Sequence, residues 1–332
     1  MVALYITSPE VAAGKSMICA GVGKHLLSDG KNVGFLKPVI VGGKAQPGDD
    51  AAFMKQILNL PESVESVCPA FSDESRLVSK VKDVYSSVSQ GKDVVLVEGI
   101  SGQNKLSADI AGALKAKVIV VADYSRQSPA AKLSNGYKEF GENLLGVVLN
   151  KVPVSQMKRV SEELSPLFDK AGVTLLGIVP EDRKLLSLTV GELADAIQGE
   201  VLNDAEKAMD VVENLMAGAM YVDSGLDYFG RKDNKAVVVR SDRPDMQMAA
   251  LETSTKCLVL TGDEEPIDYV CSKAADRGVP VISTRSDTSS VIQSLEEALS
   301  TARFNQAKKL PRLVDIIEKN LDFKVVYKGL GI

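Results

Sequence analysis

Histidine and tryptophan are almost missing from this chain, which has one histidine and no tryptophan among 332 residues. A lone histidine cannot build a multi-histidine metal site, and it argues against a Ser-His-Asp triad. We interpret His25, which falls on the first predicted helix, as a structural residue. The four cysteines lie scattered in apolar stretches without metal-like spacing, which indicates reduced thiols in a cytoplasmic protein. They are Cys19, Cys68, Cys257 and Cys271.

Long apolar runs and an excess of one charge are also absent. No segment approaches the roughly 18 apolar residues of a membrane span, and the amino terminus enters a predicted strand directly, so we expect no membrane contact and no signal peptide. The 39 basic and 44 acidic residues leave a net charge of -5, which argues against nucleic acid as a partner. The length allows two domains, each with its own core.

Short apolar runs alternate with amphipathic stretches from residue 1 to about residue 199. The runs are rich in valine, isoleucine and leucine, as is typical of strands covered on both faces by helices. The alternation predicts an α/β fold with a mostly parallel sheet. The predicted strands are Val2–Thr7, Val33–Lys37, Val94–Glu98, Val118–Ala122, Leu145–Asn150 and Leu175–Val179. The predicted helices include Lys15–Ser28, Asp50–Leu58, Glu74–Ser89, Ala130–Phe140 and Ser155–Lys170.

This pattern breaks near residue 199, and Asp204–Ala217 is predicted to be a connecting helix. Three further apolar runs each lead to a polar turn with an aspartate and then to a predicted helix, which indicates a second, smaller α/β domain. The runs are Ala236–Val239, Cys257–Leu260 and Val279–Ser283. We therefore expect a first domain at residues 1–199, a connecting helix within 200–217 and a second domain at 218–332.

The segment Ser8–Ser16 reads Ser-Pro-Glu-Val-Ala-Ala-Gly-Lys-Ser and joins the first predicted strand to the first predicted helix. Backbone N–H groups of such a loop and of the following helix form a donor nest for a polyphosphate. Lys15 would reach the outer phosphates and Ser16 would hold a magnesium ion. The usual first glycine of G-x-x-x-x-G-K-[ST] would fall at Pro9, so the loop is one residue longer when counted from Ser8. A strand-to-helix turn that only happens to contain Gly-Lys-Ser is the alternative.

Polar residues recur where the predicted strands of the first domain end, and these carboxyl ends share one edge of a parallel sheet. MgATP needs donors for its phosphates and hard oxygen ligands for its cation. Ser16, Asp50 and Glu98 could supply magnesium oxygens directly or through water, while Lys15 and Lys37 could offset charge on a transferred group.

Asn150, at another strand end, could donate to and accept from a base edge. Each residue also has a plainer role. Asp50 could be a helix N-cap and Glu98 a solvated strand end, while Asn150 could begin a turn and Lys37 lie at the surface.

In the second domain, four residues fall at strand-to-helix turns on one predicted sheet edge: Asp242, Arg243, Asp287 and Thr288. Helix amino termini together with one arginine could bind a small anionic effector or a nucleotide. Alternatively, the aspartates and Thr288 cap helices while Arg243 pairs with one of the aspartates.

Residues 1–199 resemble the dethiobiotin synthetase and cobyrinic acid diamide synthase group of P-loop ATPases. The shared features are the lengthened loop before Gly14-Lys15-Ser16, Lys37-Pro38-Val39, the helix start at Asp50, Val97-Glu98-Gly99 and Gly146-Val147-Val148-Leu149-Asn150. Two departures are Ser8 in place of the first glycine and the loop Gly99-Ile100-Ser101-Gly102, where the group has a fuller small-residue loop.

The resemblance implies ATP and Mg²⁺ as ligands. By it, Ser16, Asp50 and Glu98 organise magnesium, Asn150 contacts adenine, and Lys37 faces the reacting carboxyl or carbamate. Lys15 and Lys37 would be the catalytic residues. The implied nucleotide-binding residues are Glu10, Val11, Ala12, Ala13, Gly14, Lys15, Ser16, Met17 and Asn150.

Gly177-Ile178-Val179-Pro180-Glu181 and the residues after it resemble the junction between such an ATPase domain and a DRTGG domain, as in the amino-terminal half of long phosphotransacetylases. The stretch Ser241-Asp242-Arg243-Pro244-Asp245 keeps the Asp-Arg of the signature but has Pro244-Asp245-Met246 in place of Thr-Gly-Gly. This resemblance implies a ligand-sensing domain, a link to acetyl-phosphate or acyl metabolism, and a homodimer.

Three hypotheses for function follow. The first is a cytoplasmic, magnesium-dependent ATP-binding protein coupled to a DRTGG sensor domain, with a regulatory role. The second is an ATP-dependent ligase that activates a carboxyl or carbamate as a phosphate anhydride. The third is a pseudo-enzyme whose altered loop binds no nucleotide.

Overall fold

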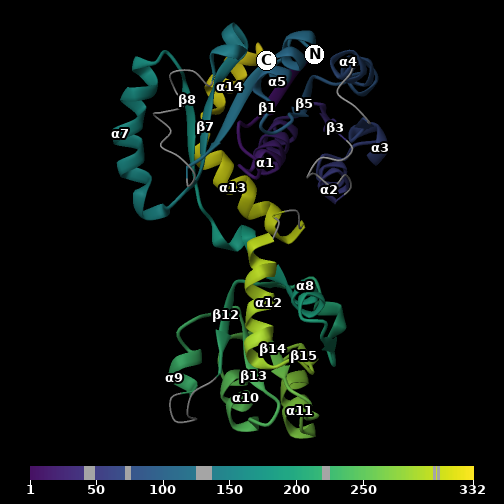
Figure 1. Ribbon diagram of the computed structural model, residues 1–332, viewed down its shortest axis with the longest axis vertical. Helices are drawn as coiled ribbons and strands as arrows, with labels where there is room; N and C mark the ends of the chain where they lie inside the picture. The colour runs from purple at the N-terminus through teal and green to yellow at the C-terminus, as the bar shows by residue number, and fades with distance from the viewer. Residues whose placement is uncertain (41–48, 72–75, 125–136, 219–224, 302–303, 305–306) are drawn as a thin grey trace. The chain divides into compact units, whose positions relative to one another are not determined.

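The structure is a computed structural model of the chain, shown in Figure 1. It describes residues 1–40, 49–71, 76–124, 137–218, 225–301, 304 and 307–332. The chain divides into two compact units, the first formed by Met1–Asp182 with Asn305–Ile332 and the second by Arg183–Phe304. Most of the predicted helix at 130–140 lies outside the described residues.

A six-stranded parallel sheet forms the centre of the first unit, in the order β2-β5-β1-β6-β7-β8. Its strands are β1 (Val2–Thr7), β2 (Val33–Leu36), β5 (Val94–Glu98), β6 (Lys117–Asp123), β7 (Leu144–Val152) and β8 (Leu175–Pro180). The predicted parallel α/β sheet is therefore confirmed, because continuous apolar runs of this kind are stable only when helices cover both faces.

Helices do cover both faces of this sheet (Figure 1). On one face, α4 (Leu77–Val88), α5 (Asn104–Ala113) and α7 (Met157–Lys170) share a buried core with the central strands. On the other face lies α1 (Lys15–Ser28), so close that a Cβ added at Gly23 would be 3.0 Å from Cδ1 of Leu96. Helix α5 was not predicted from the sequence. The connection between β2 and β5 also contains α2 (Asp49–Ile57), α3 (Val64–Val67), β3 (Val39–Ile40) and β4 (Ala70–Phe71).

The carboxyl-terminal segment packs on the first unit, which corrects the expected second domain at 218–332. Helix α13 (Leu310–Asn320) crosses α1 so closely that a Cβ at Gly21 would lie 2.4 Å from Cγ1 of Ile317. Leu321 then bridges Gly177 of β8, and α14 (Phe323–Leu330) follows. An amphipathic helix pattern reveals an apolar face, but not which domain that face covers.

His25 lies between α1 and this segment, in agreement with a structural role. Its ring stacks on Phe323 with the centroids 3.6 Å apart, and its Nδ1 is 2.9 Å from Oε1 of Glu318. All four cysteines are free thiols, and three of them are buried.

The second unit contains a five-stranded sheet in the order β10-β15-β14-β13-β12, with β10 antiparallel and the other pairs parallel. The strands are β10 (Glu200–Val201), β12 (Asn214–Ala217), β13 (Lys235–Arg240), β14 (Thr255–Thr261) and β15 (Val281–Thr284). The helices are α8 (Val190–Ala196), α9 (Gly225–Phe229), α10 (Pro244–Leu251), α11 (Asp268–Asp276) and α12 (Thr288–Thr301). Buried apolar clusters lie on both sides of the sheet, so the expected second α/β domain is confirmed.

The predicted connecting helix at 204–217 is wrong. Ala205–Lys207 form a single 3₁₀ turn, after which β11 (Val211–Val212) pairs with β9 (Leu188–Thr189) and β12 joins the sheet beside β13. The helix-forming composition of this segment is outweighed by strand pairing and burial, which local propensity does not report. The second unit therefore begins at Arg183, before the expected boundary at 199.

No helix among the described residues is long and apolar enough to cross a bilayer.

We predict that Gly177→Ala loosens the carboxyl-terminal segment from β8, because the new Cβ would lie 2.2 Å from the backbone oxygen of Asn320. The expected loss in free energy of unfolding is about 2 kcal/mol, typical of overpacking, measured by urea denaturation. The matched control is Gly112→Ala on α5, which meets nothing within 4 Å and should not destabilise. Equal stability of the two variants would contradict this packing.

Candidate functional site

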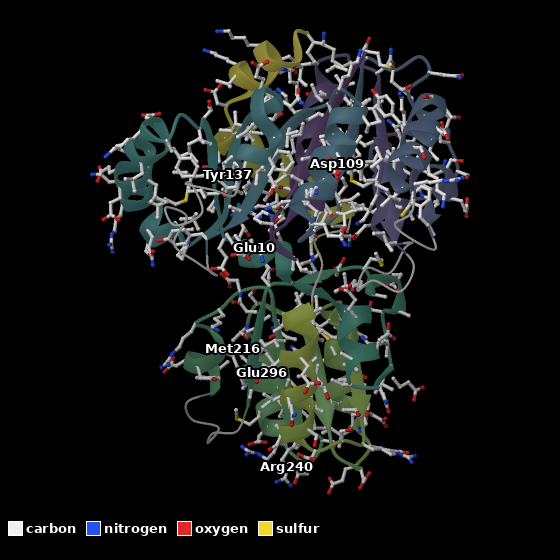
Figure 2. All side chains as sticks on the ribbon, turned by 45° about the horizontal axis from the view of Figure 1, so that its top comes forward. Glu10, Asp109, Tyr137, Met216, Arg240 and Glu296 are labelled. Atoms are coloured by element: carbon white, nitrogen blue, oxygen red, sulfur yellow. The ribbon has the colours of Figure 1, made fainter. Side chains whose placement is uncertain are left out.

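The loop between β1 and α1 bends at Gly14, where glycine is required. Gly14 has a φ of 94°, and a Cβ there would lie 2.1 Å from Nδ2 of Asn150. Nearby, the N–H of Glu10 donates to Oγ of the buried Ser8 at 3.0 Å. No side chain among the described residues caps α1, so its first-turn N–H groups are available to a ligand. Figure 2 labels Glu10 of this loop.

Lys15 opens α1 and is almost completely buried, with 8% of its surface exposed. Its Nζ donates to Oγ of Ser101 in the loop after β5. Burial lowers the pKa of Lys15, and the carboxylate of Glu98 acts in the opposite direction. A buried ammonium close to a neutral hydroxyl gains strongly when an anion arrives, because the anion replaces the lost hydration.

Four of the predicted residues form a continuous chain of polar contacts next to Lys15. Ser16 Oγ donates to Oε1 of Glu98 at 2.8 Å, and Lys37 Nζ lies 3.0 Å from both Oε1 of Glu98 and Oδ2 of Asp50. Burial disfavours the charged form of Lys37, but Glu98 and Asp50 outweigh that effect and raise its pKa. The buried Oε2 of Glu98 has no hydrogen-bond partner among the described residues. The plainer alternatives of a solvated Glu98 and a surface Lys37 are therefore wrong.

The loop after β5 is pressed against β1. A Cβ at Gly99 would lie 2.6 Å from the ring of Tyr5, so only glycine allows this approach. Burial raises the pKa of the Tyr5 hydroxyl to about 12. The N–H of Gly102 donates to the carbonyl of Ser8 at 3.2 Å, which ties this loop to the loop before α1. The contact holds Ser101 next to Lys15.

Asn150 reaches the same loop from β7. It is 1% exposed, and its Nδ2 donates to the carbonyl of Ala13 at 2.8 Å, while its Oδ1 is buried without a partner among the described residues. The next residue, Lys151, donates from Nζ to the carbonyl of Ala12 at 2.7 Å and to Oδ2 of Asp123 at 3.0 Å.

Roles for Ser101, Asp123 and Lys151 were not predicted from the sequence. Asp123 follows a buried apolar run, which is the same signal that identified Glu98. Lys151 adjoins Asn150, but only the backbone geometry shows that both side chains contact one loop.

In the second unit, the structure bears out the plainer reading for Asp287, which caps a helix, whereas Asp242 and Arg243 pair with residues outside the four candidates. Asp242 pairs with Arg240, which Figure 2 labels, and Arg243 pairs with Asp245 through Nη2 at 2.8 Å. Asp287 accepts hydrogen bonds from the N–H groups of Ser289 and Ser290 and so caps α12. Thr288 Oγ1 lies 2.8 Å from Oγ1 of Thr261. The turns after β13 and β15 thus hold the four residues, with β14 between them.

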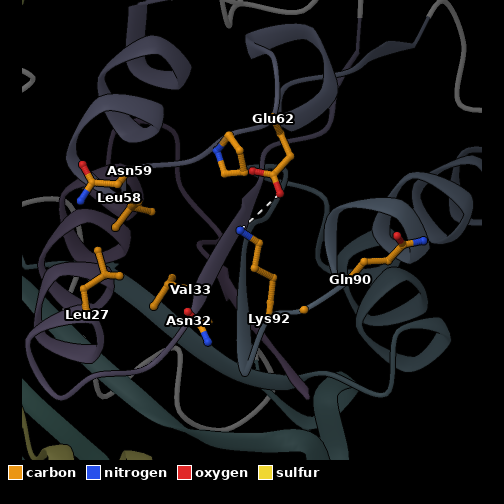
Figure 3. A pocket seen from close by; sticks show the side chains of 10 residues that line it. Leu27, Asn32, Val33, Leu58, Asn59, Glu62, Gln90 and Lys92 are labelled. Atoms are coloured by element: carbon orange, nitrogen blue, oxygen red, sulfur yellow. Dashed lines mark ion pairs between the residues drawn. The ribbon is translucent and has the colours of Figure 1, made fainter.

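A cavity of about 290 Å³ lies at the opposite end of the first unit's strands (Figure 3). It is lined by residues that include Leu27, Asn32, Leu58, Glu62 and Lys92. An ion pair of 3.3 Å joins Lys92 to Glu62 across it. None of the predicted site residues lines this cavity, so it is separate from the loop site.

A protein-family model described as an AAA domain matches residues 2–188, and a DRTGG domain model matches residues 192–298. The chain belongs to this AAA-domain family. It is thus a P-loop domain of a nucleotide-binding class joined to a DRTGG domain.

Curated relatives agree with this assignment. A phosphate acetyltransferase of Nitratidesulfovibrio vulgaris is 23% identical over 356 residues, covering 96% of this chain and 50% of that protein. An ATP-dependent dethiobiotin synthetase of Bacillus cereus is 27% identical over 202 residues, covering 54% of this chain and 84% of that enzyme. The chain spans about half the length of the phosphate acetyltransferases it matches. Both resemblances seen in the sequence are confirmed.

Among solved structures, the MinD cell division protein of Aquifex aeolicus matches 56% of this chain and 84% of its own, with 18% identity and a TM-score of 0.39.

We predict that Glu98→Gln lowers the free energy of unfolding by about 3 kcal/mol, because it removes one partner of a buried ion pair. Urea denaturation measures the loss. The control Glu162→Gln breaks an exposed pair with Lys158 and should cost about 0.5 kcal/mol or less. If Glu98→Gln is as stable as the control, the carboxylate of Glu98 does not stabilise the positive charges of Lys15 and Lys37 in the folded protein.

Proposed function

We propose that the first unit binds ATP with Mg²⁺ and that the DRTGG unit senses a small anionic ligand, so that the protein has a regulatory role in acetyl-phosphate or acyl metabolism. One observation supports nucleotide binding. Lys15, whose side chain is buried, is the first residue of a helix that no described side chain caps. The same residues bring cationic and N–H donors together at the carboxyl edge of a parallel sheet, where ligands of such sheets bind.

The oxygen atoms around Ser16 suit a magnesium ion that is held partly by the nucleotide. Ser16 Oγ and Oε2 of Glu98, which has no hydrogen-bond partner within the described part of the chain, offer hard oxygen ligands. No group of three or more His, Cys, Asp or Glu side chains among the described residues could hold a metal alone. Because Lys37 already engages Asp50, we expect Asp50 to act on the ion through water or through Lys37. The bound ion would neutralise charge on the phosphates.

The loop residues 10–17 would bind the phosphates. The acceptor Oδ1 of Asn150, to which no described residue donates, would face the base. Lys37 would face the transferred group beside the loop that carries Ser101. We propose an adenine nucleotide because the related dethiobiotin synthetase is described as ATP-dependent.

The sensing role rests on the similarity to phosphate acetyltransferases, which extends over nearly the whole chain. The candidate effector residues are Asp242, Arg243, Asp287 and Thr288. An anion at this sheet edge would have to draw Arg243 from Asp245, since that pair is already made. We also propose a cytoplasmic homodimer, as the two resemblances imply.

The alternative function is an ATP-dependent ligase that activates a carboxyl or carbamate. The position of Lys37 favours it, because its ammonium is held between two carboxylates beside the loop after β5 and could stabilise charge on an acyl phosphate.

We predict that Lys15→Ala abolishes measurable binding of MgATP, because it removes the buried cation that meets the outer phosphates. Calorimetric titration with ATP, ADP and GTP, with and without Mg²⁺, measures the loss. Lys82→Ala, on the exposed side of α4, is the control and should bind as the parent does. Unchanged binding by Lys15→Ala would show that the loop is not a phosphate site, and absence of binding by the parent would favour the pseudo-enzyme.

Sensor and ligase predict different responses to small molecules. For a sensor, acetyl phosphate should change ATP affinity by about fivefold or more, and ATP should change acetyl phosphate affinity by the same factor. For a ligase, ADP release should depend on a small carboxylate or amine. Titrations in both orders, together with an ADP-release assay, separate the two. Equal ATP affinities with and without acetyl phosphate would exclude acetyl phosphate as the effector.

A further inference from the structure

Strand β7 contains an extra residue at Asn150 and Lys151. Leu149 pairs with Ile178 of β8 and Val152 pairs with Pro180, so β7 uses one more residue than β8 over this step. Lys151 has a φ of 60°, an unusual conformation for a residue with a side chain. Such bulges re-aim side chains and are frequent beside functional sites.

The bulge brings two consecutive side chains to the same loop. In a regular strand, neighbouring side chains point to opposite faces. Here Asn150 binds the carbonyl of Ala13 and Lys151 binds the carbonyl of Ala12, at 2.8 and 2.7 Å. Both carbonyls are thus held by donors from β7. Ala12 itself has a φ of 60°, so the loop adopts a backbone conformation that needs support.

Asp123, at the end of β6, completes this arrangement. Its carboxylate is 1% exposed and lies 3.0 Å from Nζ of Lys151, and its N–H donates to Oε2 of Glu10 at 3.0 Å. Asp123 and Asn150 are register partners on adjacent strands. The loop is therefore tied to the sheet through side chains in both directions, by Glu10 at one point and by Lys151 at another.

We propose that Lys151, oriented by Asp123, is a positioning residue that holds the loop before α1 open for a polyphosphate before any ligand arrives. It fixes the carbonyl of Ala12 away from the ligand, so the N–H groups that follow are free for phosphate oxygens. Lys151 acts on the phosphates through the loop, and it does not read the base. The effect expected on ligand affinity rests on the proposed nucleotide function, whereas the effect expected on loop order does not.

The test compares Lys151→Met, which keeps the stem but loses the ammonium, with Lys151→Arg, which keeps a donor for Ala12 and Asp123. Asp123→Asn/Lys151→Met is added because it leaves no buried carboxylate without its partner. The matched control is Lys158→Met on α7, where Lys158 pairs with Glu162 on an exposed helix face. Circular dichroism confirms that each variant is folded.

The first measurement needs no ligand. In the parent, the backbone order parameters of Ala12, Ala13 and Gly14 are expected to be about 0.85. In Lys151→Met and in the double variant they are expected to fall below about 0.6. Lys151→Arg and Lys158→Met should stay near the parent. Unchanged order in Lys151→Met would overturn the proposal, whatever the protein binds.

The second measurement is the affinity for MgATP and for tripolyphosphate, which has no base. Lys151→Met should weaken both by about tenfold, the size of one hydrogen bond from a charged donor. A loss for ATP alone would place Lys151 against the base or ribose and overturn the proposal. If the parent binds neither ligand while loop order still falls in Lys151→Met, the proposed nucleotide function fails and the positioning role stands.

Discussion

The carboxylate of Glu98 is the group on which the arrangement of the site depends. Two lysines lie near it, Lys15 buried and Lys37 mostly buried, and a negative charge close by offsets the cost of removing their charges from water. Glu98 stands at the end of a fully buried strand, so its position is set by the sheet and not by a loop. Two ammonium groups can therefore lie close together in the absence of a ligand. The carboxylate of Glu98 already offsets part of their repulsion and desolvation when the protein folds.

The strands and the loop site were predictable because their signals are local. Buried parallel strands are continuous apolar runs, and a polar residue directly after such a run lies at the sheet edge, which is how Glu98 and Asn150 were found. Contacts between segments that are distant in the sequence were not predictable in this way. Nothing in the local pattern shows the extra residue of β7, so the contact of Lys151 with Ala12 could not be inferred. The helix expected at 204–217 failed for a related reason, since its residues favour a helix locally but pair as strands.

In the second unit, the position of the polar turns agrees with the sensing hypothesis, whereas the existing ion pairs do not. Its polar turns follow β13 and β15 at the same edge of the sheet, but Asp242 and Arg243 already form ion pairs with neighbours such as Asp245. An effector would therefore have to exchange partners with existing ion pairs. Exchange of this kind can couple ligand binding to a change in local structure, because the side chains released must find new partners.

The first unit is discontinuous in sequence, since residues 183–304 are inserted between β8 and the helix that covers α1. During synthesis, the six-stranded sheet emerges from the ribosome long before α13. The apolar surface of α1 around Gly21 therefore stays uncovered while the whole inserted unit is made. The inserted unit, which has its own buried apolar clusters, is therefore synthesised in full before the first unit acquires the helix that covers α1. Fragments that end at the close of the family match at residue 188 would expose that surface and would be expected to aggregate.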